Sequence, residues 1–260
     1  MTTLIQPMFA ANAAVYAIQN ATTEGKATVV ALLILSLFSW TIIITKFRQL
    51  LIARQATKKF LAAYSSTRDP LDIQRKGEEF DGAPAYQLYI RGADELAYQL
   101  KNNPVTVKGE RRISTASFEA VKVALEEAAS GEAMALEKGM IVLSTAVAGG
   151  PFIGLLGTVW GVMSTFAGIA ESRAATLTAM APGVAAALVA TVTGLLVAIP
   201  AMFAYNFMVT TIRAITQELD GYATRYATQI VHGYVDNRDL EDKIAMALTR
   251  SEMDENTPAI

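Results

Sequence analysis

The chain has 260 residues, of which 52% are hydrophobic and only 18% are charged, and its formal net charge is −2. This balance offers no basic surface for nucleic acid, so we expect no nucleic-acid partner. The absence of cysteine excludes disulfides and thiolate metal sites. The charges are also unevenly spread, because three long stretches contain none: 27–45, 139–170 and 174–212.

The first 26 residues differ from an ordinary signal peptide, because the first basic residue is Lys26. Residues 4–20, with the sequence LIQPMFAANAAVYAIQN, predict a short amphipathic helix that lies on a membrane surface. The alternative is a frayed terminal segment.

The uncharged stretches are long enough to cross a bilayer, since about 20 apolar helical residues span its hydrocarbon core. Three such stretches are hard to bury inside a soluble domain of this size. We therefore predict an all-α integral membrane protein with three transmembrane helices, over 27–45, 139–170 and 179–205.

The basic residues predict the orientation of these helices. Six of them follow the first span before any acid occurs: Lys46, Arg48, Arg54, Lys58, Lys59 and Arg68. Because positive charge is retained on the inner side of a membrane, the N-terminus is expected outside. The segments outside the membrane are then 1–26 and the loop 171–178 on the outer side, and 46–138 and the tail 206–260 on the inner side.

The inner segment 46–138 is rich in both signs of charge and is expected to be helical. Loop signals at 81–87 and 101–109 enclose a short helix over 86–102. After Pro104 no proline occurs before Gly150, which predicts one continuous helix running into the second span. The third span is expected to continue likewise into the tail, where apolar residues recur at helical spacing: Ile212, Ile215, Leu219, Tyr222, Tyr226 and Ile230.

Small residues form a stripe along the second span. They are Gly150, Gly154, Gly157, Gly161, Ser164 and Gly168. The third span has a matching face: Gly183, Ala187, Ala190, Gly194, Val197 and Ala201. Such faces let helices approach closely in lipid. Two compatible interpretations stay open. The small-residue faces pack the two helices on each other, or they form a smooth wall around a partner that moves.

Hydroxyl groups are the polar side chains at membrane depth, and Thr158 and Thr191 lie near the middle of their spans. Each hydroxyl can bond its own helix or face a lumen and hold water. The spans contain no acid, lysine or histidine, and the single His232 belongs to the tail. We therefore expect no enzyme activity, no metal and no cofactor.

The stretches GGPFIGLLGTVWGVMSTFAGIA and PGVAAALVATVTGLLVAIPAMFAYN resemble the ExbB/TolQ branch of the MotA/TolQ/ExbB ion-channel family. The parts GLLGTVWG and AIPAMFAYN are the most specific. The resemblance covers the second and third spans with their loop, and the three-span layout agrees with it.

The resemblance implies a homopentamer in the bacterial inner membrane, with the N-terminus periplasmic and the C-terminus cytoplasmic. The pentamer would surround a dimer of a single-span ExbD/TolR-type partner, and proton flow would drive work on a TonB/TolA-type effector. The family's polar pore threonines correspond to Thr158 and Thr191, and the second and third spans would line the pore. The glycines Gly150, Gly154, Gly157, Gly161, Gly183 and Gly194 would then form a pore or packing face.

One position departs from the family pattern G-[IV]-A-E-A-L-[IV]-A-T, because Ala186 occupies the place of the glutamate. Ala186 precedes Thr191 by about one helical turn. The chain thus supplies no titratable group at membrane depth. The alternative to a motor subunit is a membrane scaffold that assembles without conducting, either naturally or through an introduced change of glutamate to alanine.

Overall fold

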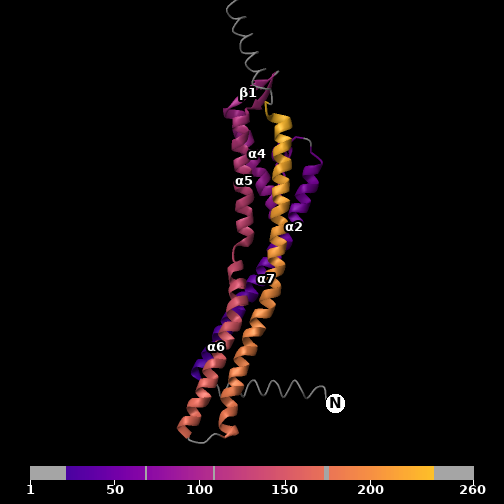
Figure 1. Ribbon diagram of the computed structural model, residues 1–260. Helices are drawn as coiled ribbons and strands as arrows, with labels where there is room; N and C mark the ends of the chain where they lie inside the picture. Colours follow the sequence, from indigo (N-terminus) through magenta and orange to yellow (C-terminus); the bar gives the residue numbers. More distant parts are fainter. Residues whose placement is uncertain (1–21, 68, 108, 173–175, 237–260) are drawn as a thin grey trace, which may run out of the picture. The chain divides into compact units, whose positions relative to one another are not determined.

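The computed structural model of the protein describes residues 22–67, 69–107, 109–172 and 176–236 (Figure 1). Its elements in chain order are α2 (Thr23–Ser65), α3 (Asp72–Lys76), α4 (Pro84–Asn102), β1 (Pro104–Val107), β2 (Glu110–Ile113), α5 (Thr115–Glu137), α6 (Met140–Ser172) and α7 (Leu177–Tyr234). The amphipathic helix predicted for residues 4–20 lies outside the described residues.

Three of the described helices, α2, α6 and α7, are long and apolar enough to cross a membrane. The prediction of an α-helical membrane protein with three spans is therefore confirmed. Two of these helices are much longer than a bilayer requires. α2 has 43 residues and continues well past residue 45, and α7 has 58 residues and continues past residue 205, as the periodicity of the tail predicts.

The prediction of one continuous helix leading into the second span was wrong. α5 ends at Glu137 and α6 begins at Met140, with a turn between them. Gly139 in this turn has φ of 89°, a left-handed conformation that glycine adopts without steric cost. The second span therefore starts as a separate helix, and the chain enters α6 from a bend.

The prediction of a loop over 101–109 was also wrong. β1 and β2 form an antiparallel hairpin, in which Pro104 pairs with Ile113 and Val107 pairs with Glu110. The two residues between the strands include Gly109 at φ of 86°, the conformation that tight hairpins require. The β-branched residues of the sequence PVTV favour strand over loop, and the loop prediction gave this short run too little weight.

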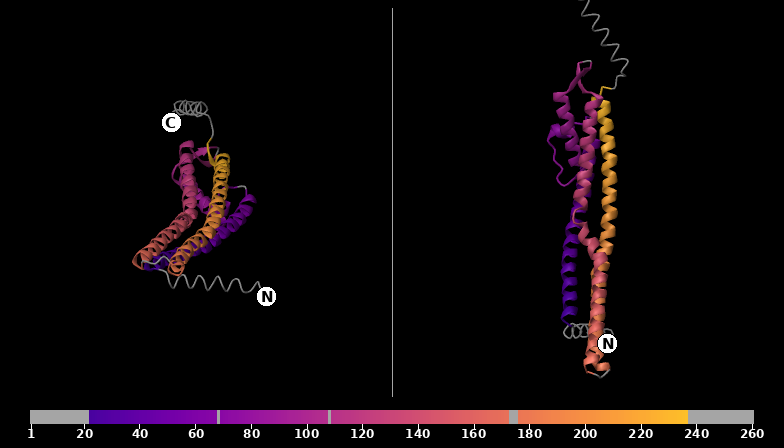
Figure 2. Two further views of the ribbon diagram at one scale, coloured as in Figure 1. Left: turned by 60° about the horizontal axis from the view of Figure 1, so that its bottom comes forward. Right: turned by 60° about the vertical axis from the view of Figure 1, so that its left-hand side comes forward.

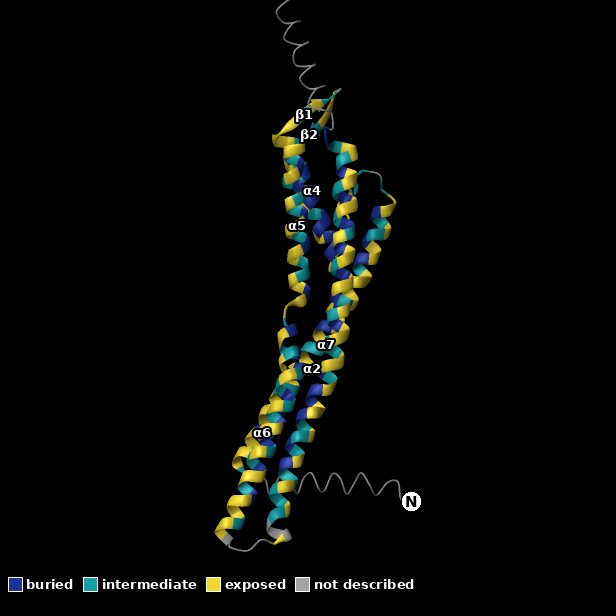
Figure 3. Ribbon diagram, viewed as in Figure 1, coloured by how far each residue is buried: buried dark blue, intermediate teal, exposed yellow. Residues whose placement is uncertain are grey.

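The described residues divide into two compact units. The span unit consists of 22–51 and Leu136–Arg213, and the aromatic unit consists of Ile52–Ala135 and 214–236. Within the span unit α6 and α7 lie side by side (Figure 2). Exposed apolar residues cover much of the surface of this unit. Buried and exposed residues alternate along the helices of both units (Figure 3).

Candidate ion-pathway helices and the polar network

The glycine faces of α6 and α7 meet each other directly. A methyl group added at Gly150 would lie 3.1 Å from the carbonyl oxygen of Gly194, and one added at Gly161 would lie 3.1 Å from that of Gly183. A methyl group at Gly154 would lie 3.0 Å from the carbonyl oxygen of Ala190. These contacts show that the two helices run antiparallel with their backbones almost touching.

Six of the seven glycines predicted to lie on the two faces lie in this seam. Gly157 faces Ala190 and also Thr28 of α2, whose hydroxyl oxygen would lie 3.0 Å from an added methyl group. Gly168 at the end of the stripe has no neighbour within 4 Å of such a group. Packing of α6 on α7 therefore accounts for the six glycines in a single chain, and their part in a pore stays a prediction.

The threonines of the spans differ in their hydrogen bonds. The hydroxyl of Thr158 donates to the carbonyl of Leu155 at 2.6 Å, and that of Thr165 donates to the carbonyl of Gly161 at 2.8 Å. Both bonds stay within α6. The hydroxyl of Thr191 instead crosses the seam to the carbonyl of Gly154 at 3.4 Å, a long and weak hydrogen bond.

Thr158 and Thr191 lie on the same flank of the seam. At about 100° per residue, each is turned about 80° from the centre of its small-residue face, in the direction of increasing residue number. Because α6 and α7 are antiparallel, the same sense of rotation carries both side chains to one side of the helix pair. On α7 this flank continues into exposed apolar residues, including Val184, Leu188 and Leu195.

Ala186 lies on the opposite flank of α7. Five residues separate it from Thr191, which corresponds to about 140° around the helix. It aligns instead with Thr193, seven residues later, and both are half-buried. The family pattern therefore places its glutamate and its threonine on different sides of the seam in this chain, as a spacing of five residues along a helix requires.

The aromatic unit has a core of seven rings: Phe60, Tyr64, Phe80, Tyr86, Tyr89, Tyr222 and Tyr226. Phe60 of α2 is fully buried, and its ring centroid lies 5.5–5.9 Å from those of five neighbours. These edge-to-face and tilted pairs join α2, α4 and α7. Burial raises the pKa of Tyr89 to about 12.

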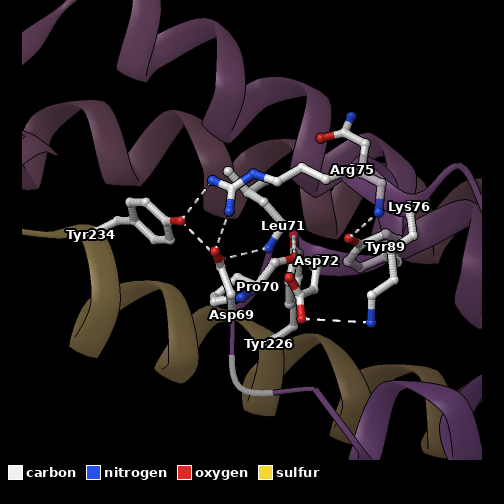
Figure 4. Close-up of polar contacts among 10 residues, drawn as sticks. Asp69, Pro70, Leu71, Asp72, Arg75, Lys76, Tyr89, Tyr226 and Tyr234 are labelled. Carbon is white, nitrogen blue, oxygen red and sulfur yellow. Dashed lines mark hydrogen bonds and ion pairs between the residues drawn. The ribbon is translucent and has the colours of Figure 1, made fainter.

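A polar network ties the loop before α3 to the end of α7 (Figure 4). The carboxylate of Asp69 accepts hydrogen bonds from the hydroxyl of Tyr234 at 2.8 Å and from the backbone N–H of Leu71 at 3.0 Å, and it pairs with Arg75. Burial alone would raise the pKa of Asp69, but these hydrogen bonds and the Arg75 charge together lower it. The carboxylate is thus held ionised.

This network and the aromatic core were not predicted from the sequence. Pairs of aromatic residues three or four apart, at 60 and 64, 86 and 89, and 222 and 226, are the signal that could have indicated the core. Nothing in the spacing of Asp69, Arg75 and Tyr234 indicates their contact. Among the described ranges, no group of three or more His, Cys, Asp or Glu side chains is arranged to hold a metal ion.

Comparison with known proteins relates the seam to a family. The sequence model of the MotA/TolQ/ExbB proton channel family matches residues 97–221, which include α6 and the first part of α7. The Tol-Pal system protein TolQ of Haemophilus influenzae is 32% identical over 210 residues, which cover 78% of this chain and 87% of that protein. The chain belongs to the MotA/TolQ/ExbB proton channel family.

Two further relatives agree with this membership. The Tol-Pal system protein TolQ of Pseudomonas aeruginosa is 33% identical over 190 residues, covering 73% of this chain and 80% of that protein. The biopolymer transport protein ExbB of Pseudomonas putida is 32% identical over 191 residues, covering 72% of this chain and 54% of that protein. The resemblance drawn from the span motifs is therefore confirmed.

Family membership, together with the three apolar helices, makes this a multi-pass protein of the bacterial inner membrane. As a member of a proton channel family it is a transport protein and not an enzyme. The seam of α6 and α7 belongs to the part of the chain that the family model matches, which makes the helix pair the candidate functional site.

Proposed function

We propose that the protein is the ring-forming subunit of a motor that uses ion flow across the inner membrane to perform work in the periplasm. The observation that carries this proposal is the common flank of Thr158 and Thr191. These two hydroxyls lie at membrane depth on the same flank of the helix pair, which suits a wall facing a hydrated lumen. Family membership supports protons as the ion.

The ring is proposed to contain five copies, with N-termini in the periplasm and C-termini in the cytoplasm. The basic residues after residue 45 support this orientation. The exposed apolar surface of α6 and α7 supports contacts with lipid or with neighbouring copies, since a single chain leaves it uncovered. Native mass spectrometry of the detergent-extracted protein should show pentamers, and a monomer as the sole species would contradict the ring.

The ring is proposed to surround two copies of a single-span ExbD/TolR-type partner and to act on a TonB/TolA-type effector. The names of the relatives, TolQ and ExbB, support this class of partner. The residues of the chain also call for it, because the described parts of the spans at 27–45, 139–170 and 176–212 contain no acid or base. A proton carrier at depth must then come from the partner or from water.

The hydroxyls of Thr158 and Thr191 would solvate a partner carboxylate as it ionises. An unpaired charge at the centre of a bilayer costs at least about 2.5 kcal/mol even on the mildest scale. The long bond of Thr191 to Gly154 makes this hydroxyl readily available to a second acceptor. Replacement of both threonines by valine should lower proton flux in proteoliposomes that contain ring and partner, while pentamers persist.

The matched control is Thr193→Val. The hydroxyl of Thr193 bonds its own helix at the carbonyl of Val189 and lies on the other flank. Flux should be unchanged in this variant. An equal loss of proton flux in the control and in the double variant would reject a specific role for the flank that carries Thr158 and Thr191.

A second candidate function is a scaffold that assembles without conducting, and Ala186 favours it because the family's carboxyl group is missing there. Measurement of proton flux with alanine and with glutamate at position 186 separates the two. Strong flux with alanine that Ala186→Glu does not increase supports a motor in which the partner alone carries the proton. Flux that requires glutamate supports the scaffold, or an alanine introduced into a working motor.

A further inference from the structure

The turn between α5 and α6 leaves carbonyl groups without partners in their own helix. The last carbonyls of a helix lack an N–H one turn further on, and α5 stops at Glu137 because Gly139 turns away. The carbonyl of Leu136 belongs to this set. Such a helix end carries partial negative charge and favours a cation.

Lys46 of α2 supplies that cation. Its ammonium group donates to the carbonyl of Leu136 at 2.9 Å and to the side-chain oxygen of Gln49 at 2.8 Å. Only 7% of the residue is exposed. One turn earlier on α2, Ile42 lies 3.6 Å from where a methyl group on Gly139 would lie, and Lys46 itself lies 3.9 Å from that point. One face of α2 therefore contacts the turn through the apolar side chain of Ile42 and the charged side chain of Lys46.

We propose that Lys46 is a positioning residue that fixes where α6 begins, by holding the turn over 136–139 against α2. A buried ammonium is costly unless it is hydrogen-bonded, so its partners determine where the chain can lie. Lys46 directly follows one uncharged stretch, and Gly139 opens the next. The contact thus sets the start of α6 at the level where α2 leaves its own apolar stretch.

The start of α6 determines which residues of that helix face the seam. Gly150 begins the close contacts with α7 eleven residues after Gly139, and Thr158 follows within the same helix. A helix that begins from a loosened turn can slide or rotate, which would bring side chains in place of glycine against α7. In this way Lys46 would act on the ion-pathway residues without touching them, and this consequence rests on the proposed function.

The test is hydrogen exchange of the full-length protein in a membrane mimetic, with variants Lys46→Met, Lys46→Arg and Arg48→Met. Lys46→Met keeps the length of the side chain but removes the ammonium. Exchange of the backbone amide of Val142, which donates to the carbonyl of Gly139 at 3.2 Å, should rise about tenfold or more, the factor expected for loss of one hydrogen bond to a charged group. Lys46→Arg keeps a charged donor and should restore most of the protection.

Arg48→Met is the matched control, because it removes an exposed positive charge two residues away. It should leave exchange of the Val142 amide unchanged. The proposal is overturned if the amide at the turn exchanges no faster in Lys46→Met than in the Arg48→Met control. It is also overturned if that amide exchanges as fast in Lys46→Arg as in Lys46→Met. A uniform rise over α6 and α7 would also overturn it, because that result indicates general destabilisation.

Hydrogen exchange requires no ion flow, so this result stands or falls independently of the proposed motor. Proton flux measured on the same variants then tests the link to function. A Lys46→Met ring with fast exchange at the turn and reduced flux supports a role in the ion pathway. Unchanged flux in that variant leaves the positioning role in place and rejects the consequence drawn for transport.

Discussion

In the span unit α6 and α7 approach one another backbone to backbone across glycines, whereas in the aromatic unit α2, α4 and α7 are held by seven large rings. In lipid, apolar side chains gain nothing by leaving water, so close backbone packing is the main source of attraction. Where water is the alternative, large rings bury much apolar area and stabilise the contact. The long helices α2 and α7 take part in both kinds of packing, each along a different part of their length.

The largest effect is expected from breaking the aromatic core. Phe60→Ala should lower the free energy of unfolding of the aromatic unit by about 3–5 kcal/mol, the usual cost of removing a buried ring. Tyr98→Ala on α4 is the control, since Tyr98 is 58% exposed and should change stability little. Chemical denaturation followed by tyrosine fluorescence measures both. Similar midpoints for the two variants would contradict the dependence on the ring cluster.

The next effect tests the glycine seam. In Gly194→Ala the new methyl group would lie 2.6 Å from the carbonyl oxygen of Gly150, so the helices must separate, at a cost of about 1–3 kcal/mol. Gly149→Ala adds the same group where no atom lies within 4 Å. Because alanine favours helix, this control should be neutral or slightly stabilising. Thermal unfolding in detergent measures both variants. Equal unfolding temperatures would show that the stability of the seam does not depend on close approach of the two helices.

A smaller effect is expected from the hydroxyl that crosses the seam. Thr191→Val should destabilise the helix pair by about 0.6 kcal/mol, the average for a hydrogen bond between membrane helices. Thr191→Ser should retain the bond. The reversible unfolding of the protein in mixed micelles measures the difference. A loss well above this value would mean that the 3.4 Å bond is stronger in the membrane than its length indicates.

The smallest effect concerns the Asp69 network and depends on pH. The pKa of Asp69 is lowered in the folded protein, so its contribution to stability is fully present above its unfolded pKa of about 3.9 and is lost as pH falls through the folded value. Protection of the loop over 69–75 should therefore be constant from about pH 5 to 8. In the Asp69→Asn variant the protection of this loop should not fall at low pH, because no carboxylate is present at position 69 to be protonated. Loosening of this loop near pH 6 in the unaltered protein would refute the assignment.

The sequence predicted the features that depend on local composition and period. Three uncharged stretches indicate three spans, because crossing hydrocarbon requires a run of apolar residues whatever the neighbours are. The helix predicted over 86–102 between two loop signals agrees with α4 to within two residues, and the extension of α7 followed from the spacing of apolar residues. The expected helix from Pro104 to Gly150 failed, because a glycine turn and a strand pair of four residues each are short signals within a strongly helical context.

The sequence by itself determined that this chain spans a membrane, that two of its spans carry small-residue faces, and that it belongs with the ExbB and TolQ proteins. Only the tertiary structure decided which faces meet and that Thr158 and Thr191 lie on one flank of the seam. The separation of Ala186 from Thr191 around α7 follows from their spacing along a helix. Contacts such as Lys46 to Leu136 or Asp69 to Tyr234 join residues far apart in the chain. Periodicity describes one helix at a time, and such contacts exist only once the helices have packed.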